Sequence, residues 1–226
     1  MKDHYKIAID GPAGAGKSTV AKAVAACLDI QYLDTGAMYR ALALYAQRIG
    51  VSCLHEEAVS AMLSDADITV SYVEKGQRTW LNGEDVTDIL RTPSLSMGAS
   101  DISAHPCVRD HMTLLQRQVA ETYPIVMDGR DITTNVLRDT PYKFYLSATA
   151  EQRAVRRLRE MRAHGNETTT LEEVLADISL RDRNDSSRAY MPLSIASDAT
   201  VIDTTELSIE EAVLSVLESI KEKERV

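Results

Sequence analysis

The pattern of apolar and polar residues alternates along the chain between the period of a β-strand and that of an α-helix. Alternate residues are apolar over Tyr5–Ile9, whereas apolar residues recur at helical spacing over Lys17–Leu28. Further strands are predicted at 32–34, 124–128, 143–147 and 201–203, and further helices at 35–50, 55–63 and 106–123 and from Pro93, Thr149, Thr170 and Ser208 onward. This alternation is typical of an α/β fold with a central parallel sheet covered by helices.

The pattern changes between residues 63 and 103, where it indicates an antiparallel hairpin. Strand-like alternation runs over 68–72 and resumes at 79–81, followed by the two-residue turn signal Asn82-Gly83. A third extended piece is predicted over Val86–Leu90. We therefore expect the 226 residues (1–226) to form a single domain with a small antiparallel sheet inserted over 63–103.

Composition and charge narrow the classes of function. The hydrophobic fraction of 44% is enough for a substantial core, and the net charge of −9 argues against bulk attraction to nucleic acid or anionic membranes. No run approaches the roughly 20 apolar residues of a membrane span, and the N-terminus has no signal-peptide core. The widely spaced Cys27, Cys53 and Cys107 are interpreted as small buried hydrophobes in a reducing cytoplasm.

The most specific motif is GPAGAGKST at Gly11–Thr19, which lies between the first predicted strand and the first predicted helix. It matches G-x-x-x-x-G-K-[ST], a phosphate-binding loop in which backbone N–H groups and the helix N-terminus face phosphate oxygens. Lys17 would contact the β and γ phosphates, and Ser18 would hold Mg²⁺. A glycine-rich turn with an incidental lysine is the weaker interpretation, because both flanking elements are present. The residues expected to bind the nucleoside triphosphate here are Gly11, Pro12, Ala13, Gly14, Ala15, Gly16, Lys17, Ser18 and Thr19.

A second candidate is Asp128-Gly129-Arg130-Asp131, which directly follows an apolar strand. An acid at a strand end near a phosphate loop can hold magnesium, usually through water, so Asp128 joins Ser18 as a candidate metal ligand. Arg130 and Asp131 would then face the same cleft. A polar turn closed by a local Arg–Asp pair is an equally acceptable interpretation of this tetrapeptide alone.

Five arginines are concentrated in one predicted helix, at Arg153, Arg156, Arg157, Arg159 and Arg162. The first three are spaced i, i+3 and i+4, so they share a face. A solvated face would normally mix in acids, yet Glu160 is the only acid between Arg153 and Arg162. In a chain of net charge −9, this concentration indicates contact with polyphosphate.

A further candidate constellation is Arg181, Asp185 and Arg188. If the helix that starts near Leu171 continues this far, the spacing i, i+4 and i+7 puts all three residues on one side. Two arginines could hold the carboxylate ionised and aim it at a ribose hydroxyl. Taken alone, a surface ion-pair ladder of little energetic value is the simpler interpretation.

Together these segments resemble bacterial cytidylate kinases over nearly the whole chain. The resemblance rests on GPAGAGKST (11–19), LDTGAMYR (33–40), the segment 100–109, DGRD (128–131) and R-x-x-x-D-x-x-R-x-x-x-P-L (181–193). The inserted hairpin also fits, since this family has an enlarged monophosphate-binding insertion. One departure is Thr133, where the family usually has glycine, which puts the local turn in question more than the chemistry.

The resemblance implies a P-loop kinase that transfers the γ-phosphate of ATP to CMP or dCMP, with Mg²⁺ as cofactor, in a cytoplasmic protein expected to be a monomer. It implies a helical lid over 153–188 in which Arg153 and Arg157 contact ATP. The implied acceptor-binding residues are Thr35, Tyr39, Arg40, Ser100, Arg109, Arg130, Asp131, Arg181, Asp185 and Arg188. The implied catalytic residues are Lys17, Arg130, Arg157 and Arg188.

Within the acceptor set, the resemblance divides the roles. Arg40 and Arg130 would hold the acceptor phosphate, and Asp185 with its two neighbouring arginines would hold the sugar. Ser100, Arg109 and Asp131 would read the cytosine ring.

Three alternatives remain open from the residues alone. A UMP or AMP kinase is the nearest, and competition between acceptors would separate it from a CMP kinase. A small-metabolite kinase would not need the Arg181, Asp185 and Arg188 group around a ribose. A GTPase-type switch would normally show D-x-x-G and N-K-x-D motifs, and the sequence contains neither.

Overall fold

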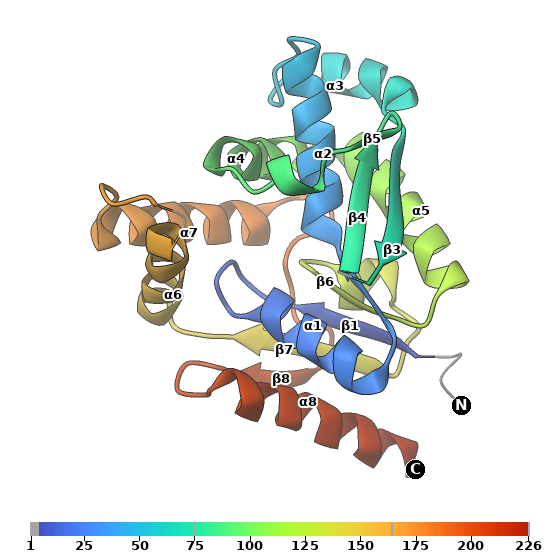
Figure 1. Ribbon diagram of the computed structural model, residues 1–226, viewed down its shortest axis with the longest axis vertical. Helices are drawn as coiled ribbons and strands as arrows, with labels where there is room; N and C mark the ends of the chain where they lie inside the picture. Colours follow the sequence, from blue (N-terminus) through green and yellow to red (C-terminus); the bar gives the residue numbers. More distant parts are fainter. Residues whose placement is uncertain (1–4, 75, 164, 226) are drawn as a thin grey trace.

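A central sheet of five parallel strands organises the molecule, as predicted (Figure 1). The computed structural model describes residues 5–74, 76–163 and 165–225. In spatial order the strands are β2 (Gln31–Asp34), β6 (Ile125–Gly129), β1 (Lys6–Asp10), β7 (Tyr142–Ser147) and β8 (Thr200–Asp203). All run in the same direction, so the loops after their carboxyl ends gather at one edge of the sheet.

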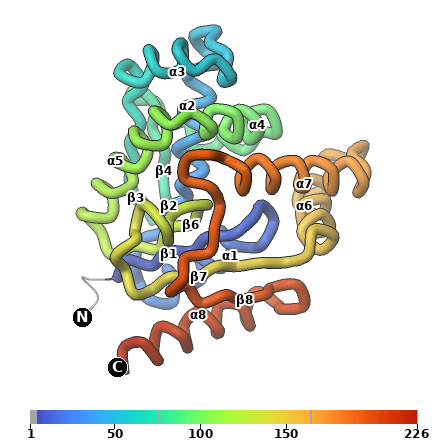
Figure 2. Tube along the Cα trace, turned by 180° about the vertical axis from the view of Figure 1, so that it is seen from behind, coloured from blue at the N-terminus to red at the C-terminus, as the bar shows by residue number. Residues whose placement is uncertain are grey.

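Helices cover both faces of this sheet (Figures 1 and 2). Helices α1 (Lys17–Leu28) and α8 (Ile209–Glu224) pack on one face, and α2 (Thr35–Arg48) and α5 (Pro106–Thr122) lie on the other. Successive side chains of β1 point to opposite faces of the sheet. Ile7 and Ile9 therefore join the first core, which lies under α1 and α8, and Ala8 joins the second core, which lies under α2 and α5. Both cores are fully buried, so each large aliphatic side chain contributes about 1.5–3 kcal/mol of transfer free energy.

The predicted antiparallel insertion is present as a small sheet of β3 (Ile68–Val73), β4 (Gly76–Leu81) and β5 (Glu84–Asp85). Asn82 and Gly83 both have positive φ, of 49° and 80°, which is the hairpin turn that an Asn-Gly pair favours. The prediction of a third strand over Val86–Leu90 was wrong. The strand is shorter and earlier, and Thr87–Ile89 forms a 3₁₀ turn because the Asp85 carboxylate accepts the Thr87 N–H.

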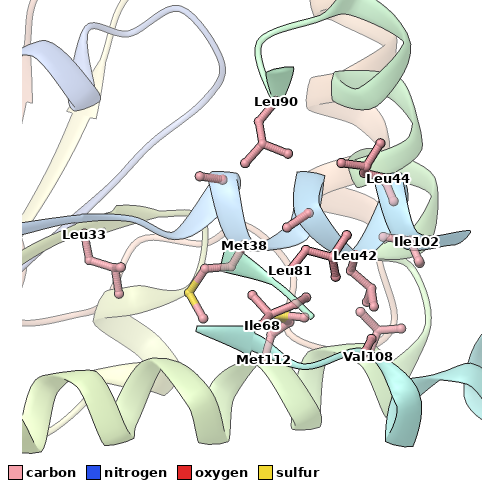
Figure 3. Close-up of a cluster of buried hydrophobic side chains, with 14 of the residues drawn as sticks. Leu33, Met38, Leu42, Leu44, Ile68, Leu81, Leu90, Ile102, Val108 and Met112 are labelled. Atoms are coloured by element: carbon pink, nitrogen blue, oxygen red, sulfur yellow. The ribbon is translucent and has the colours of Figure 1, made fainter. Parts of the chain in front are cut away.

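The inserted sheet packs on the second core rather than standing apart. Figure 3 shows Met38 and Leu42 of α2, Ile68 and Leu81 of the hairpin and Met112 of α5 pointing toward one another. The remaining elements of this part are α3 (Glu56–Met62), a 3₁₀ turn over Leu63–Asp65 and α4 (Pro93–Ile102). Pro93 opens α4 as predicted, and the Thr92 side chain caps it.

Two helices, α6 (Ala150–Ala163) and α7 (Leu171–Ser187), project together from one side of the sheet (Figures 1 and 2). A small apolar cluster of Ala154, Val174 and Ile178 lies between them. Ser or Thr followed three residues later by Glu or Gln predicts a capping box at the start of α6, α7 and α8. The boxes Thr170–Glu173 and Ser208–Glu211 are fully formed, and at the start of α6 the Thr149 hydroxyl accepts the Gln152 N–H at 3.3 Å. Arg181 and Asp185 therefore lie within α7, and Arg188 follows its last residue.

The three cysteines are free thiols, but the expectation that all are buried was wrong. Cys27 is exposed near the end of α1, whereas Cys53 and Cys107 are partly buried against the second core. Of the helices in the described ranges, none is long and apolar enough to cross a membrane.

Candidate active site

The phosphate-binding loop follows β1 directly and runs into α1, as the motif predicts. Gly11 has φ 149°, and a Cβ on it would lie 2.0 Å from the Leu146 carbonyl oxygen, so only glycine allows this approach to β7. Lys17 is buried, and its Nζ donates to the Pro12 carbonyl at 2.8 Å. Burial and the nearby charge of Arg130 lower the pKa of Lys17 to about 7. Phosphate oxygens would restore its full positive charge.

The two candidate magnesium ligands contact each other at the start of α1. Ser18 Oγ donates to Asp128 Oδ2 at 2.8 Å, and the Tyr32 hydroxyl donates to Asp128 Oδ1 at 2.7 Å. Burial and the charge of Asp34 raise the pKa of Asp128. No group of three or more His, Cys, Asp or Glu side chains in the described part of the chain could hold a metal ion. One hydroxyl and one carboxylate fit Mg²⁺, which keeps several waters and takes its remaining ligands from substrate phosphates.

Asp34, at the end of β2, connects the insertion to the acceptor side of the site. Its carboxylate accepts the Ala37 N–H at 2.9 Å as the N-cap of α2 and pairs with Arg40 at 2.8 Å. Its own N–H donates to Gln77 Oε1 at 2.7 Å. Gln77 belongs to β4, so the inserted hairpin supports the segment that carries Arg40.

Arg109 and Asp131 form a buried ion pair, with Nη2 2.6 Å from Oδ1. Arg109 is only 2% exposed, and its Nη1 also donates to the Ser103 carbonyl at 3.3 Å. The second oxygen of Asp131 accepts from Asn135 Nδ2 at 3.2 Å. The predicted cytosine-reading pair is thus held from two sides by other groups of the protein.

A second buried carboxylate, Asp185, lies among three arginines. Its Oδ2 is 2.7 Å from Arg130 Nε and its Oδ1 is 3.5 Å from Arg188 Nη2. Burial alone would raise the pKa of Asp185, but the charges of Arg130, Arg188 and Arg181 outweigh it and lower that pKa. Burial and repulsion from Arg130 lower the pKa of Arg181 to about 10. These arginines are crowded enough that an added anion would relieve their repulsion.

One cavity of about 270 Å³ joins the phosphate-binding loop to this arginine group. The predicted site residues that line it are Ala13, Gly14, Gly16, Lys17, Ser18, Thr19, Thr35, Tyr39, Arg40, Ser100, Arg109, Asp128, Arg130, Asp131, Arg157, Arg181, Asp185 and Arg188. Gly11, Pro12, Ala15 and Arg153 are not among the described residues that line it. Lining residues that were not predicted include Asp34, Ser96, Ser103 and Gln116.

The arginines of α6 divide into anchored and cavity-facing side chains, which their spacing does not predict. Arg153 is buried and donates to the Ala13 carbonyl at 3.0 Å while pairing with Asp182 at 2.6 Å. Arg156 donates to Thr204, whose hydroxyl in turn donates to the Ala15 carbonyl at 3.0 Å. Arg157 is the member of this trio that lines the cavity. Arg153 and Arg156 therefore brace the phosphate-binding loop through the protein's own oxygens.

Asp10, which the sequence analysis did not single out, fixes the turn after Asp131. This fully buried carboxylate accepts from the Ile132 N–H at 3.0 Å, the Thr133 N–H at 2.7 Å and the Thr133 hydroxyl at 2.6 Å. Thr133 does not need a left-handed φ, since the described non-glycine residues with positive φ are Asp29, Asn82 and Met191. The turn questioned above accepts threonine because its hydroxyl has a partner, and Ile132–Val136 continues as a single π-helical turn, η4.

A phosphate-binding loop that faces an arginine-lined acceptor pocket across one cavity defines a P-loop nucleoside monophosphate kinase. The sequence model of the family described as "Cytidylate kinase" matches residues 7–222. The chain belongs to the cytidylate kinase family.

Two curated relatives carry the same description. The cytidylate kinase of Desulfitobacterium hafniense (strain Y51) is 46% identical over 223 residues, which is 99% of this chain and 95% of the relative. That of Geobacillus thermodenitrificans (strain NG80-2) is also 46% identical over 223 residues, covering 99% of both chains. A solved structure of an uncharacterized protein from Eubacterium ventriosum ATCC 27560 shares the fold, with TM-score 0.53 and 12% identity over 96% of this chain and 99% of that one.

Proposed function

We propose that this chain transfers the γ-phosphate of ATP to CMP or dCMP in a complex with Mg²⁺. The observation that carries the proposal is the charge pattern of the cavity, in which unpartnered buried donors surround the acceptor end. These donors are the Nε atoms of Arg40, Arg109, Arg181 and Arg188 and the Nε2 of Gln116. Leaving a buried donor without a partner costs about 1–3 kcal/mol, so this site favours a ligand rich in acceptor oxygens.

The roles follow from where each group lies. Lys17 would contact the β and γ phosphates, and Arg130, Arg157 and Arg188 would neutralise the charge that spreads over the transferred group. Arg40 and Arg130 would hold the acceptor phosphate, so both phosphates would meet between β1 and β6. Ser18 and, through water, Asp128 would hold Mg²⁺, which supplies charge neutralisation at the phosphate oxygens.

The base and sugar would occupy the other end of the cavity. Ser100, Arg109 and Asp131 would read the cytosine ring, with Thr35 and Tyr39 beside it, and Arg181, Asp185 and Arg188 would hold the sugar. The acceptor is already an anion, so no strong general base is needed. The work of the site is to hold two anions in line and exclude water, and the α6–α7 pair (lid, 153–188) would provide the exclusion.

A coupled assay with Mg-ATP and a panel of CMP, dCMP, UMP, AMP and GMP tests this proposal. We expect CMP and dCMP to give the highest kcat/KM and UMP to be weaker by one to two powers of ten. AMP or UMP as the preferred acceptor would overturn it in favour of another nucleoside monophosphate kinase. We further expect a monomer in the cytoplasm that needs neither nucleic acid nor membrane, which size-exclusion chromatography and cell fractionation can check.

A further inference from the structure

Gln116 is a buried amide in the cavity for which neither the motifs nor the proposed mechanism has a role. It is 2% exposed and lines the same cavity as Arg109 and Asp131. Among the described residues its Nε2 has no hydrogen-bond partner. Since a buried amide without a partner costs about 1–3 kcal/mol, a ligand that brings an acceptor here would recover that free energy.

The position of Gln116 on α5 relates it to the base end of the cavity. Arg109, Thr113 and Gln116 are spaced i, i+4 and i+7 and are all buried, so they form one stripe of the helix. Arg109 pairs with Asp131 at 2.6 Å, and the Thr113 hydroxyl accepts from Asn135 at 2.9 Å. The stripe therefore faces the segment that follows the strand β6, and the phosphate-binding loop is carried by other elements.

The chemistry of the amide selects the kind of acceptor. The side chains proposed to meet phosphate are all cationic, whereas Gln116 is neutral and suits a neutral carbonyl oxygen. Along the cytosine edge the amino group would face Asp131, which accepts, and N3 would face Arg109, which is paired with Asp131. The acceptor left on that edge is the carbonyl oxygen at C2.

We infer that Gln116 Nε2 donates a hydrogen bond to the C2 carbonyl of the pyrimidine, which makes Gln116 a specificity-determining residue for pyrimidine recognition. The inference rests on the proposed function. Cytosine and uracil both carry this carbonyl, so Gln116 selects pyrimidines as a class. Asp131 makes the further choice between the two bases.

The test combines a variant with a change in the substrate. Gln116→Met keeps the length of the side chain and removes the amide, and 2-thiocytidine 5′-monophosphate replaces the C2 oxygen with a poorer acceptor. We expect wild-type protein to prefer CMP over the 2-thio analogue by about three- to tenfold in kcat/KM. Gln116→Met should lower kcat/KM for CMP by about the same factor, mainly through KM, and should abolish the preference for CMP over the analogue.

Two comparisons separate this role from a structural one. Gln118→Met changes an exposed glutamine of the same helix and should leave all three substrates unaffected. The ratio of kcat/KM for CMP and UMP should stay within about twofold in Gln116→Met, because both bases lose the same hydrogen bond. If Gln116→Met does not fold, Gln116→Leu, which also removes the amide and adds no charge, must show the same loss of preference.

Several results would overturn the assignment. Equal use of CMP and the 2-thio analogue by wild-type protein would do so, as would an unchanged preference in a folded variant. A shift in the CMP-to-UMP ratio would place Gln116 at the C4 edge instead. Failure of wild-type protein to phosphorylate CMP at all would overturn the proposed function itself, an outcome distinct from the other three.

Discussion

Arg130 and the buried carboxylate of Asp185 form an ion pair, with Nε 2.7 Å from Oδ2, that joins the end of β6 to the last turn of α7. The pair brings together two motifs that are far apart in the chain, and both of its residues line the cavity. It also fixes a guanidinium that we propose to hold phosphate. Asp185 is therefore a part of the phosphate site even if its own contact is with the sugar.

Replacing Asp185 with asparagine should weaken both folding and acceptor binding. The neutral amide leaves Arg130, Arg181 and Arg188 without a counter-charge, and breaking such a buried pair costs about 3 kcal/mol of unfolding free energy. We expect KM for CMP to rise at least tenfold and kcat to change less. Urea unfolding and steady-state kinetics measure both effects. Asp177→Asn, on the exposed side of the same helix, is the matched control, and equal behaviour of the two variants would contradict the prediction.

Thr133→Val should destabilise the protein more at high pH than at low pH. Burial raises the pKa of Asp10 from 3.8 to about 6, while hydrogen bonds from Thr133 favour its ionised form. Because the folded pKa lies above the unfolded value, the folded state keeps this proton longer, and the contribution of Asp10 to stability falls as pH rises from about 4 through 6. Loss of the hydroxyl raises the folded pKa further and extends that fall to higher pH.

The size of the Thr133→Val effect follows from the charge of its partner. At pH 8 the variant loses a hydrogen bond to a carboxylate, worth about 1.5–3 kcal/mol, and at pH 4 it loses one to a neutral acid, worth about 1 kcal/mol. Denaturant titrations at the two pH values measure the difference. Thr134→Val, one residue further and exposed, should show no pH-dependent loss. A constant loss from pH 4 to 8 would mean that the hydroxyl does not act on Asp10.

Much of the fold could be predicted because its signals are local. The glycine motif, the period change after Lys17 and the capping boxes each act within a few residues, and the structure confirms the elements that they define. The order of the five strands and the exposure of Cys27 depend on contacts between distant segments, which no local pattern encodes. The strand predicted over Val86–Leu90 is not formed, because the Asp85 carboxylate accepts the Thr87 N–H and the chain makes a 3₁₀ turn there.

The charged residues of the site could be predicted from the sequence, whereas its neutral residues could not. Charged residues such as Arg109 and Asp131 stand out in a motif, and the structure brings them to within 2.6 Å. Gln116 is a neutral residue in an amphipathic helix and looks like any other polar position. Spacing predicted that Arg153 and Arg157 share a role, but only tertiary contacts reveal that Ala13 and Asp182 engage the first of them.

Ligand-dependent protection from hydrogen exchange should divide α6 in two. Arg153 and Arg156 already hold the start of this helix to the phosphate-binding loop and to Thr204. Charge repulsion between the arginines is therefore not expected to make this part of the helix mobile. Further along α6, Arg157 pairs with Glu160 of the same helix, and Arg162 donates to carbonyls of the segment before α7. Val174 and Ile178 of α7 pack on Ala154 of α6. A bisubstrate analogue should therefore slow exchange over residues 157–163 and 171–178 and change residues 150–156 little. Equal protection with and without the analogue would argue against a lid, and α8 serves as the internal reference.

Asp131→Asn should narrow the preference for CMP over UMP. A carboxylate accepts hydrogen bonds, so it matches the N4 amino group of cytosine, whereas uracil presents the O4 acceptor at that position. The asparagine keeps the size and adds an NH₂ that can reach O4. Arg109 pairs with Asp131 at 2.6 Å and Asn135 donates to it at 3.2 Å, so the new amide also weakens or loses one of these two contacts and turnover of both substrates should fall. The loss should be greater for CMP, and one base contact of about 1–3 kcal/mol narrows the ratio of kcat/KM by one to two powers of ten. Steady-state kinetics with both acceptors at saturating ATP measure that ratio in the two proteins. An unchanged ratio would leave Asp131 as a structural partner of Arg109 and would move the reading of the amino group to another side chain of the cavity.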